Sequence, residues 1–139
     1  MDFNVKKVIV HYGYKAKSHD NDIALIQLET NGIPMNPDLH SVCMPTQGVS
    51  YAKQTGVVAG WGFMTLKPRV LKETVVSILS NKQCNAIPTY TDLITKNMIC
   101  VDEQVHNGEV VCRDDSGSSL VINDGETLRI VGKGVLVTL

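Results

Sequence analysis

Short apolar segments of strand length recur along the chain and are separated by residues that favour turns. Within residues 70–80 the side chains alternate with a period of two, which fits a strand better than a helix. Asp124-Gly125 predicts a hairpin, and residues 80–87 suit one short helical turn. The predicted strands cover residues 5–12, 22–28, 55–61, 70–80, 96–101, 119–123 and 128–139. Strands at this spacing predict an all-β barrel or sandwich.

The size and charge of the chain exclude several classes of protein. Its 139 residues suffice for one small domain, and 13 Lys and Arg against 14 Asp and Glu give a net charge of -1. This balance gives no electrostatic reason to expect nucleic acid or an anionic membrane as a partner. The apolar stretches fall short of the roughly 20 residues of a membrane span. Residues 1–13 contain no apolar stretch of signal-peptide length, so we expect no signal peptide here.

The cysteines and the polar residues give little reason to expect a metal or a cofactor. The four cysteines are Cys43, Cys84, Cys100 and Cys112. None lies in a Cys-x-x-Cys spacing, which argues against zinc ribbons and thioredoxin-like motifs and leaves disulfides or buried thiols. There is no Gly-rich phosphate loop, so we expect no cofactor. Asp102, Glu103 and His106 suggest a metal-ligand set, but a solvated polar loop is the favoured interpretation, and we expect no metal.

Three segments carry a family resemblance when they are taken in order. They read HDNDIALIQL at 19–28, VVAGWG at 57–62 and CRDDSGSSLV at 112–121. In this order the chain resembles the chymotrypsin- and trypsin-like serine proteases, whose nucleophile motif usually reads Cys-x-Gly-Asp-Ser-Gly-Gly-Pro-Leu-Val. The resemblance covers essentially the whole chain. It implies an all-β fold of two antiparallel barrels, with the site in the cleft between them.

The resemblance also implies how the chain maps onto that double barrel. We expect residues 1–45 to be a remnant of the first barrel with the connector, and residues 46–139 to be most of the second barrel. The trypsin-like double β-barrel is therefore expected to be incomplete at both ends. In the family a segment like Ala-Ala-His-Cys precedes the aspartate segment and supplies the triad histidine. The 21 residues before Asp22 contain no such segment.

The resemblance assigns two catalytic positions. Ser116 takes the position of the nucleophile, and Asp22 takes the position of the acid that orients the histidine. A serine hydroxyl is a weak nucleophile at neutral pH and needs an adjacent general base. His19 is the only candidate for a substitute base, and a solvated loop histidine is the favoured interpretation.

The segment around the serine, which we call the nucleophile turn (residues 114–118), departs from the family pattern. Asp114 stands where the family has the glycine whose N–H forms half of the oxyanion hole, and a carboxylate there opposes the developing negative charge. Asp115 matches the buried aspartate that pairs with the amino terminus of the mature enzyme. Without that partner we expect the turn to rearrange toward water, or Asp115 to pair with Lys133 or Arg113. Gly117 keeps the family glycine.

Several other family features are altered as well. Ser118 and Ser119 replace the glycine and proline of the family motif. Val110 takes the place of the acid at the base of the trypsin specificity pocket, so a preference for Lys or Arg is not expected. The closing segment 134–139 departs from the family strand that pairs with substrate.

The resemblance further implies how the cysteines pair. Cys84 and Cys100 match a family disulfide that forms within the chain. The family partners of Cys43 and Cys112 are missing from these residues, and the family bridge between the positions of Gly56 and Ile122 is lost at both ends.

These features lead to three hypotheses. The first is a catalytically incompetent relative or fragment of an extracellular serine endopeptidase, which would act on protein or peptide substrates if a longer gene product supplied the missing parts. The second is a pseudoprotease that binds a protease or an inhibitor. The third is a truncated gene product without a function, whose unpaired strand edges favour association.

Overall fold

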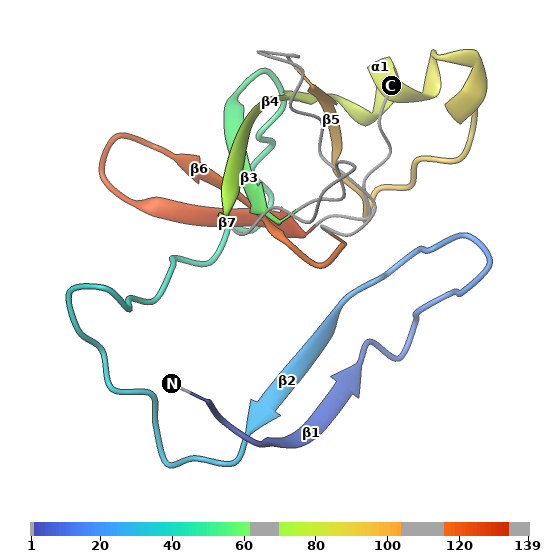
Figure 1. Ribbon diagram of the computed structural model, residues 1–139. Coiled ribbons are helices and arrows are strands. Elements are labelled where there is room, and N and C mark those ends of the chain that lie inside the picture. Colours follow the sequence, from blue (N-terminus) through green and yellow to red (C-terminus); the bar gives the residue numbers. More distant parts are fainter. Residues whose placement is uncertain (1, 62–69, 104–115, 134–139) are drawn as a thin grey trace. The chain divides into compact units, whose positions relative to one another are not determined.

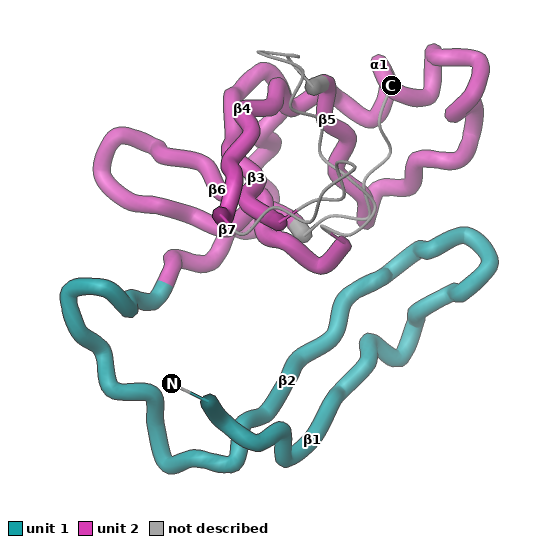
Figure 2. Tube along the Cα trace, in the orientation of Figure 1, with its two compact units in different colours: residues 1–41 teal, residues 42–139 magenta. Residues whose placement is uncertain are grey.

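The computed structural model describes residues 2–61, 70–103 and 116–133. The chain divides into two compact units, Met1–Ser41 and Val42–Leu139, which Figure 2 shows in different colours. Each unit contains one antiparallel sheet. The described residues are therefore mostly β with antiparallel sheets, as predicted, and the double barrel stays an expectation.

Unit 1 is built on a two-stranded hairpin of β1 (Val5–Val10) and β2 (Ala24–Leu28). The strands pair from Val10 with Ala24 to Val5 with Leu28, and a register shift lies near the start of β1. Apolar side chains on both faces are exposed, including Val8 at 55% on one face and Leu25 at 66% on the other. A hairpin of two strands is marginally stable when nothing covers it. The hairpin therefore gains little stability from its own apolar side chains.

Unit 2 is built on a five-stranded sheet in the order β5-β4-β3-β6-β7 (Figure 1). Its elements are β3 (Thr55–Gly60), β4 (Lys72–Leu79), α1 (Asn81–Asn85), the 3-10 helix η1 (Pro88–Tyr90), β5 (Cys100–Glu103), β6 (Ser119–Asn123) and β7 (Leu128–Lys133). All neighbouring strands in it are antiparallel. The central strand β3 joins β4, which follows it in the sequence, to β6, which comes much later.

Alternate residues of the sheet form the core of unit 2. The six buried side chains that pack together are Val58, Val76, Ile78, Leu120, Ile122 and Val131. Val76 and Ile78 are buried whereas Val75 is exposed, which confirms the predicted strand period in β4. Because each of β3, β4, β6 and β7 contributes to this cluster, burial of these side chains holds the sheet together.

Gly56 allows β3 and β6 to approach closely. A Cβ atom at this position would lie 2.7 Å from Leu120 Cδ1, 3.1 Å from the Val121 carbonyl oxygen and 3.5 Å from Ile122 Cγ2. Ile122 is itself only 2% exposed. At the two positions where the family resemblance implies a lost disulfide, the chain thus has close apolar packing.

The element boundaries refine the sequence predictions. The strand predicted at 5–12 is shorter, since β1 ends at Val10, and the strand predicted at 96–101 is displaced to Cys100–Glu103. The helical turn predicted within residues 80–87 is α1. The 3-10 helix η1 was not predicted, although a proline at its first position is a recognised start signal. Residues 134–139 of the last predicted strand lie outside the described residues.

The predicted hairpin at Asp124-Gly125 connects β6 to β7 and is organised by the carboxylate of Asp124. This carboxylate accepts hydrogen bonds from the backbone N–H groups of Thr127 (2.8 Å) and Glu126 (3.1 Å) and from Arg129 Nη2 (3.1 Å). The two backbone donors, followed by Arg129, lower the pKa of Asp124 from 3.8 to about 2. Arg129 Nη1 also donates to the carbonyl oxygen of Met44 at 2.7 Å, which ties the segment before β3 to this hairpin.

The lowered pKa of Asp124 predicts a dependence of stability on pH. A carboxylate whose pKa is lower in the folded state stabilises the fold above its unfolded pKa of 3.8 and loses that contribution as the pH falls to about 2. We expect the difference in free energy of unfolding between the native chain and Asp124→Asn to be constant above pH 3.8 and to shrink toward pH 2. Urea denaturation over this range measures it, and a difference that does not change with pH would contradict the assignment.

Candidate active site

The described part of the nucleophile turn lies directly before β6. Ser116 is exposed, and Gly117 has a φ of +95°, a conformation that glycine adopts without strain. Ser119 begins β6 and pairs with Lys133 of β7, and Leu120 is buried in the core. The sheet therefore fixes the chain just after Ser116 and leaves the hydroxyl-bearing residue at the surface.

Several predicted site residues lie outside the described residues. These are Val110, Cys112, Arg113, Asp114, Asp115 and His106. Their predicted effects on the oxyanion hole and the specificity pocket stay predictions. Asp102 and Glu103, the other members of the suggested metal-ligand set, belong to β5. Among the described residues, no group of three His, Cys, Asp or Glu side chains is placed to hold a metal ion.

Asp22 lies in the segment that we call the aspartate loop (residues 11–23), which joins β1 to β2. Asp22 is half-buried, and its position is fixed from both sides by backbone hydrogen bonds. The N–H of Ile23 donates to the Asn21 carbonyl oxygen at 2.8 Å, and the N–H of His11 donates to the Ile23 carbonyl oxygen at 3.0 Å. Asn21 has a φ of +55° and donates from Nδ2 to the Gly13 carbonyl oxygen at 3.0 Å.

Asp20 is a second acid of the aspartate loop that the sequence did not single out. It is the one buried residue among those described in unit 1, with 8% of its surface exposed. Its carboxylate lies 3.6 Å from Lys15 Nζ and accepts from Asn21 Nδ2 at 3.3 Å. The backbones of Lys15 and Asp20 also form a β-bridge. The contacts of Asp20 therefore stabilise the aspartate loop that contains Asp22. The sequence signalled Asp20 only through the run of polar residues in this loop.

His19, the candidate substitute base, lies at the exposed surface of the same loop with a φ of +55°. Asparagine, aspartate and histidine adopt this left-handed conformation more readily than most side chains do. His19 and Asp22 belong to unit 1, whereas Ser116 belongs to unit 2. The pairing of an acid, a base and Ser116 stays a prediction from the family resemblance.

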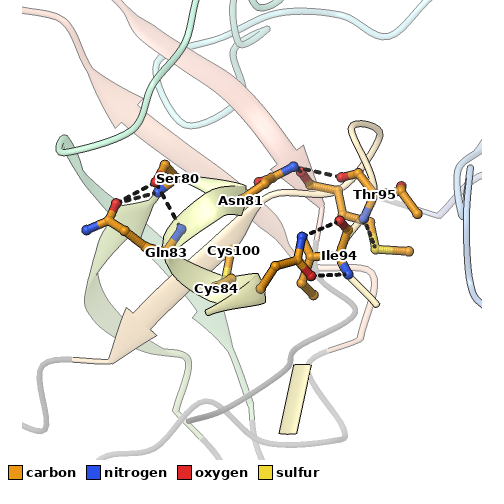
Figure 3. The surroundings of a disulfide bond; sticks show 9 residues. Ser80, Asn81, Gln83, Cys84, Ile94, Thr95 and Cys100 are labelled. Carbon is orange, nitrogen blue, oxygen red and sulfur yellow. Dashed lines mark hydrogen bonds between the residues drawn. A yellow bond between two sulfur atoms is a disulfide. The ribbon is translucent and has the colours of Figure 1, made fainter. Parts of the chain in front are cut away.

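The expected disulfide between Cys84 and Cys100 is present and joins α1 to the start of β5 (Figure 3). Their Cα atoms are 6.5 Å apart, within the usual range for such a bridge. Both cysteines are buried. Ser80 caps the helix, because its side chain accepts from the Gln83 N–H while Gln83 reaches back to the Ser80 N–H.

Two asparagines of α1 hold the loop that the disulfide closes. Asn85 exchanges two hydrogen bonds with the backbone of Ile94, donating at 2.9 Å and accepting at 3.0 Å. Asn81 Nδ2 donates to the carbonyl oxygens of Thr95 (2.7 Å) and Met98 (3.1 Å), and Figure 3 shows the Asn81 side chain facing Thr95. The bridge and the two amides together make residues 80–100 a braced segment.

Cys43 is a free, exposed cysteine in unit 2. Its backbone pairs with β7, since its N–H donates to Leu128 at 3.0 Å and its carbonyl oxygen accepts from Ile130 at 2.9 Å. The expectation that Cys43 has no disulfide partner within these residues therefore agrees with its free state here. Cys112, the other cysteine whose family partner is missing, lies outside the described residues.

Comparison with known proteins decides the family. The family model described as Trypsin matches residues 1–135. The chain belongs to the trypsin family of serine proteases. Family membership implies the chymotrypsin fold, which agrees with the antiparallel sheets of both units.

Individual relatives come from several animals. The chain is 33% identical over 133 residues to human transmembrane protease serine 5, covering 92% of this chain and 29% of that protein. It is 33% identical over 139 residues to mouse transmembrane protease serine 11G, covering 94% and 33%. It is 37% identical over 133 residues to chicken trypsin I-P1, covering 93% and 51%. The chain thus spans between 29% and 51% of the length of these trypsin-family relatives. No helix in the described ranges has the length and apolar character needed to cross a membrane.

The braced segment predicts the effect of removing the disulfide. Replacing Cys84 and Cys100 together by alanine opens a loop with a sequence separation of 16 residues, and we expect the free energy of unfolding to fall by about 2–4 kcal/mol. Urea denaturation of the double variant measures the loss. A matched Cys43→Ala variant, which removes the exposed free thiol, should leave the stability nearly unchanged. Equal losses in both variants would contradict this account.

Proposed function

We propose that this chain carries the nucleophile and the triad aspartate of a serine endopeptidase domain at Ser116 and Asp22, and that these 139 residues alone do not hydrolyse peptides. Membership of the trypsin family supports the chemistry and a peptide or protein substrate. The exposure of Ser116 directly before the anchored strand β6 supports its assignment as the residue presented to a substrate. No cofactor is needed for acyl transfer by this route.

The altered nucleophile turn is the main reason to propose inactivity. In the family the residue at the position of Asp114 donates its N–H to the oxyanion, and loss of one such donor costs about 10²–10³ in rate. A carboxylate at Asp114 also repels the negative charge that forms there. Ser118 and Ser119 replace the following glycine and proline, so we expect the backbone of the turn to differ from that of an active family member.

The proposal also includes the missing base. The four histidines are His11, His19, His40 and His106, and none lies in a segment like the family histidine motif. A serine hydroxyl loses its proton only to a base within hydrogen-bonding distance, and we propose that no histidine of these residues takes that role for Ser116. A longer gene product with such a segment would provide the base, and it would restore the enzyme hypothesis only if the turn at Asp114 also tolerated catalysis.

The remaining assignments follow from the same family. We propose that residues 1–45 are the end of the first barrel with the connector, and residues 46–139 most of the second. Val110 makes the base of any remaining specificity pocket apolar, and Asp115 takes the position of the aspartate that pairs with a mature amino terminus. The Cys84–Cys100 disulfide supports an extracellular, oxidising location.

A pseudoprotease that binds a protease or an inhibitor is the second candidate function. Retention of the sheet supports it, since the core of β3, β4, β6 and β7 is buried although the nucleophile turn has changed. The third hypothesis, a truncated product without function, is supported by the exposed apolar side chains of the β1–β2 hairpin, which favour association.

A fluorophosphonate probe, which labels activated serines, tests the proposal. We expect the 139-residue chain to show no labelling above that of its Ser116→Ala variant, because no segment of it resembles the family histidine motif and Asp114 replaces the oxyanion glycine. The same comparison is made for a longer gene product and for its Asp114→Gly variant. Labelling of Ser116 in the 139-residue chain would contradict the proposed inactivity.

Labelling and unfolding of the longer gene product distinguish the endopeptidase, the pseudoprotease and the product without function. Labelling there, increased by Asp114→Gly, supports an endopeptidase whose turn limits the rate. If neither the longer product nor its Asp114→Gly variant is labelled, and the longer product unfolds cooperatively, the result supports the binding function. Aggregation without such a transition supports the third hypothesis.

A further inference from the structure

The connector after β2 contains an Asn-Gly pair whose reactive groups are accessible. Asn31 is exposed, and no other described residue forms a hydrogen bond with its carboxamide. No heavy atom outside residues 31–33 lies within 4 Å of the place where a side chain would begin on Gly32. The side chain of Asn31 is therefore free to turn toward the backbone of Gly32.

We propose that Asn31 is a site of spontaneous deamidation through a succinimide formed with Gly32. The amide nitrogen of Gly32 attacks Cγ of Asn31, the Cγ–Nδ2 bond breaks, and ammonia leaves with the proton that the Gly32 nitrogen loses. Water then adds to the ring. Cleavage of the bond between the ring nitrogen and Cγ gives aspartate, and cleavage of the bond between that nitrogen and the main-chain carbonyl carbon gives isoaspartate. Water is the only co-reactant.

A hydrogen bond from Thr30 is the restraint that this reaction must overcome. The N–H of Gly32 donates to Thr30 Oγ1 at 3.2 Å, and the Thr30 hydroxyl donates to the Gly32 carbonyl oxygen at 2.8 Å. Both contacts are exposed, so water replaces them when they open. The net contribution of one such hydrogen bond is about 1 kcal/mol, which is too little to prevent ring closure.

The Asp124-Gly125 pair provides a contrast within the same chain. The Asp124 carboxylate is held by the N–H groups of Thr127 and Glu126 and by Arg129, so it is not free to turn toward the Gly125 nitrogen. The Gly125 N–H is engaged by Asn123 Oδ1 at 3.0 Å much as the Gly32 N–H is engaged by Thr30, so the contrast rests on the hydrogen bonds that hold the Asp124 carboxylate. The fold thus protects Asp124-Gly125 and leaves Asn31-Gly32 open.

Deamidation would change the charge of one surface hollow. Its lining residues are Lys6, Gln27, Leu28, Glu29, Thr30 and Asn31. A new carboxylate at position 31 lowers the net charge of the chain by one and lies in the same hollow as the ammonium group of Lys6. The isoaspartate product also lengthens the backbone by one methylene in the segment that leads out of β2.

Peptide mapping by mass spectrometry tests the proposal on the full chain. Tryptic cleavage places residues 31, 107 and 124 in separate peptides (18–53, 97–113 and 114–129), so Asn107-Gly108, which lies outside the described residues, does not interfere. The folded chain and the urea-unfolded chain are incubated at mildly alkaline pH, and aspartate and isoaspartate are quantified at residues 31 and 124.

We expect Asn31 to be converted in the folded chain within about tenfold of its rate in urea, because the Thr30 hydrogen bonds are weak, and any isoaspartate at position 124 to form faster in urea than in the folded chain. The matched Asn31→Gln variant should remove the conversion, because its longer side chain would have to close a larger ring. Conversion of Asn31 in urea but not in the folded chain would overturn the proposal. Equal conversion at position 124 in both states would overturn the structural contrast.

Discussion

The close packing of β3 against β6 is the contact on which unit 2 depends. Gly56 lets the two strands approach until Leu120 and Ile122 fill the space beside the backbone of β3. β3 is the centre of the sheet, and the buried cluster takes side chains from both sides of it. Because β6 follows the nucleophile turn directly, the same packing fixes the point at which the chain enters the sheet after Ser116.

This arrangement separates the scaffold from the chemistry. The scaffold is retained in the described part of unit 2, where the core, the disulfide and the Asp124 hairpin are all well organised. The proposed loss of activity lies in a few positions of the nucleophile turn, above all Asp114, and in the absence of a base. A trypsin-family domain that lost only these features would keep a stable second unit without catalysis.

The sequence predicted features that depend on neighbouring residues, and it did not predict those that depend on contacts between distant segments. Alternation in β4 and the Asp-Gly pair of the last hairpin are local signals, and both predictions are confirmed. The pairing of β3 with β6 is not visible in any window of the sequence, because it brings distant segments together. The same is true of Asn85, whose amide binds the backbone of Ile94, and of Asp20, whose burial depends on a loop. The resemblance identified Cys84 and Cys100, whereas the residues near Ser116 stay predictions.

Amide hydrogen exchange measures whether the β3–β6 contact organises unit 2. We expect the slowest exchange in β3, β4 and β6, where the strands are paired and the core is buried, and much faster exchange in β1 and β2. A Gly56→Ala variant should accelerate exchange throughout the five-stranded sheet, since its Cβ collides with Leu120. Protection of the β1–β2 hairpin equal to that of β3, or no change in the sheet on Gly56→Ala, would contradict the account.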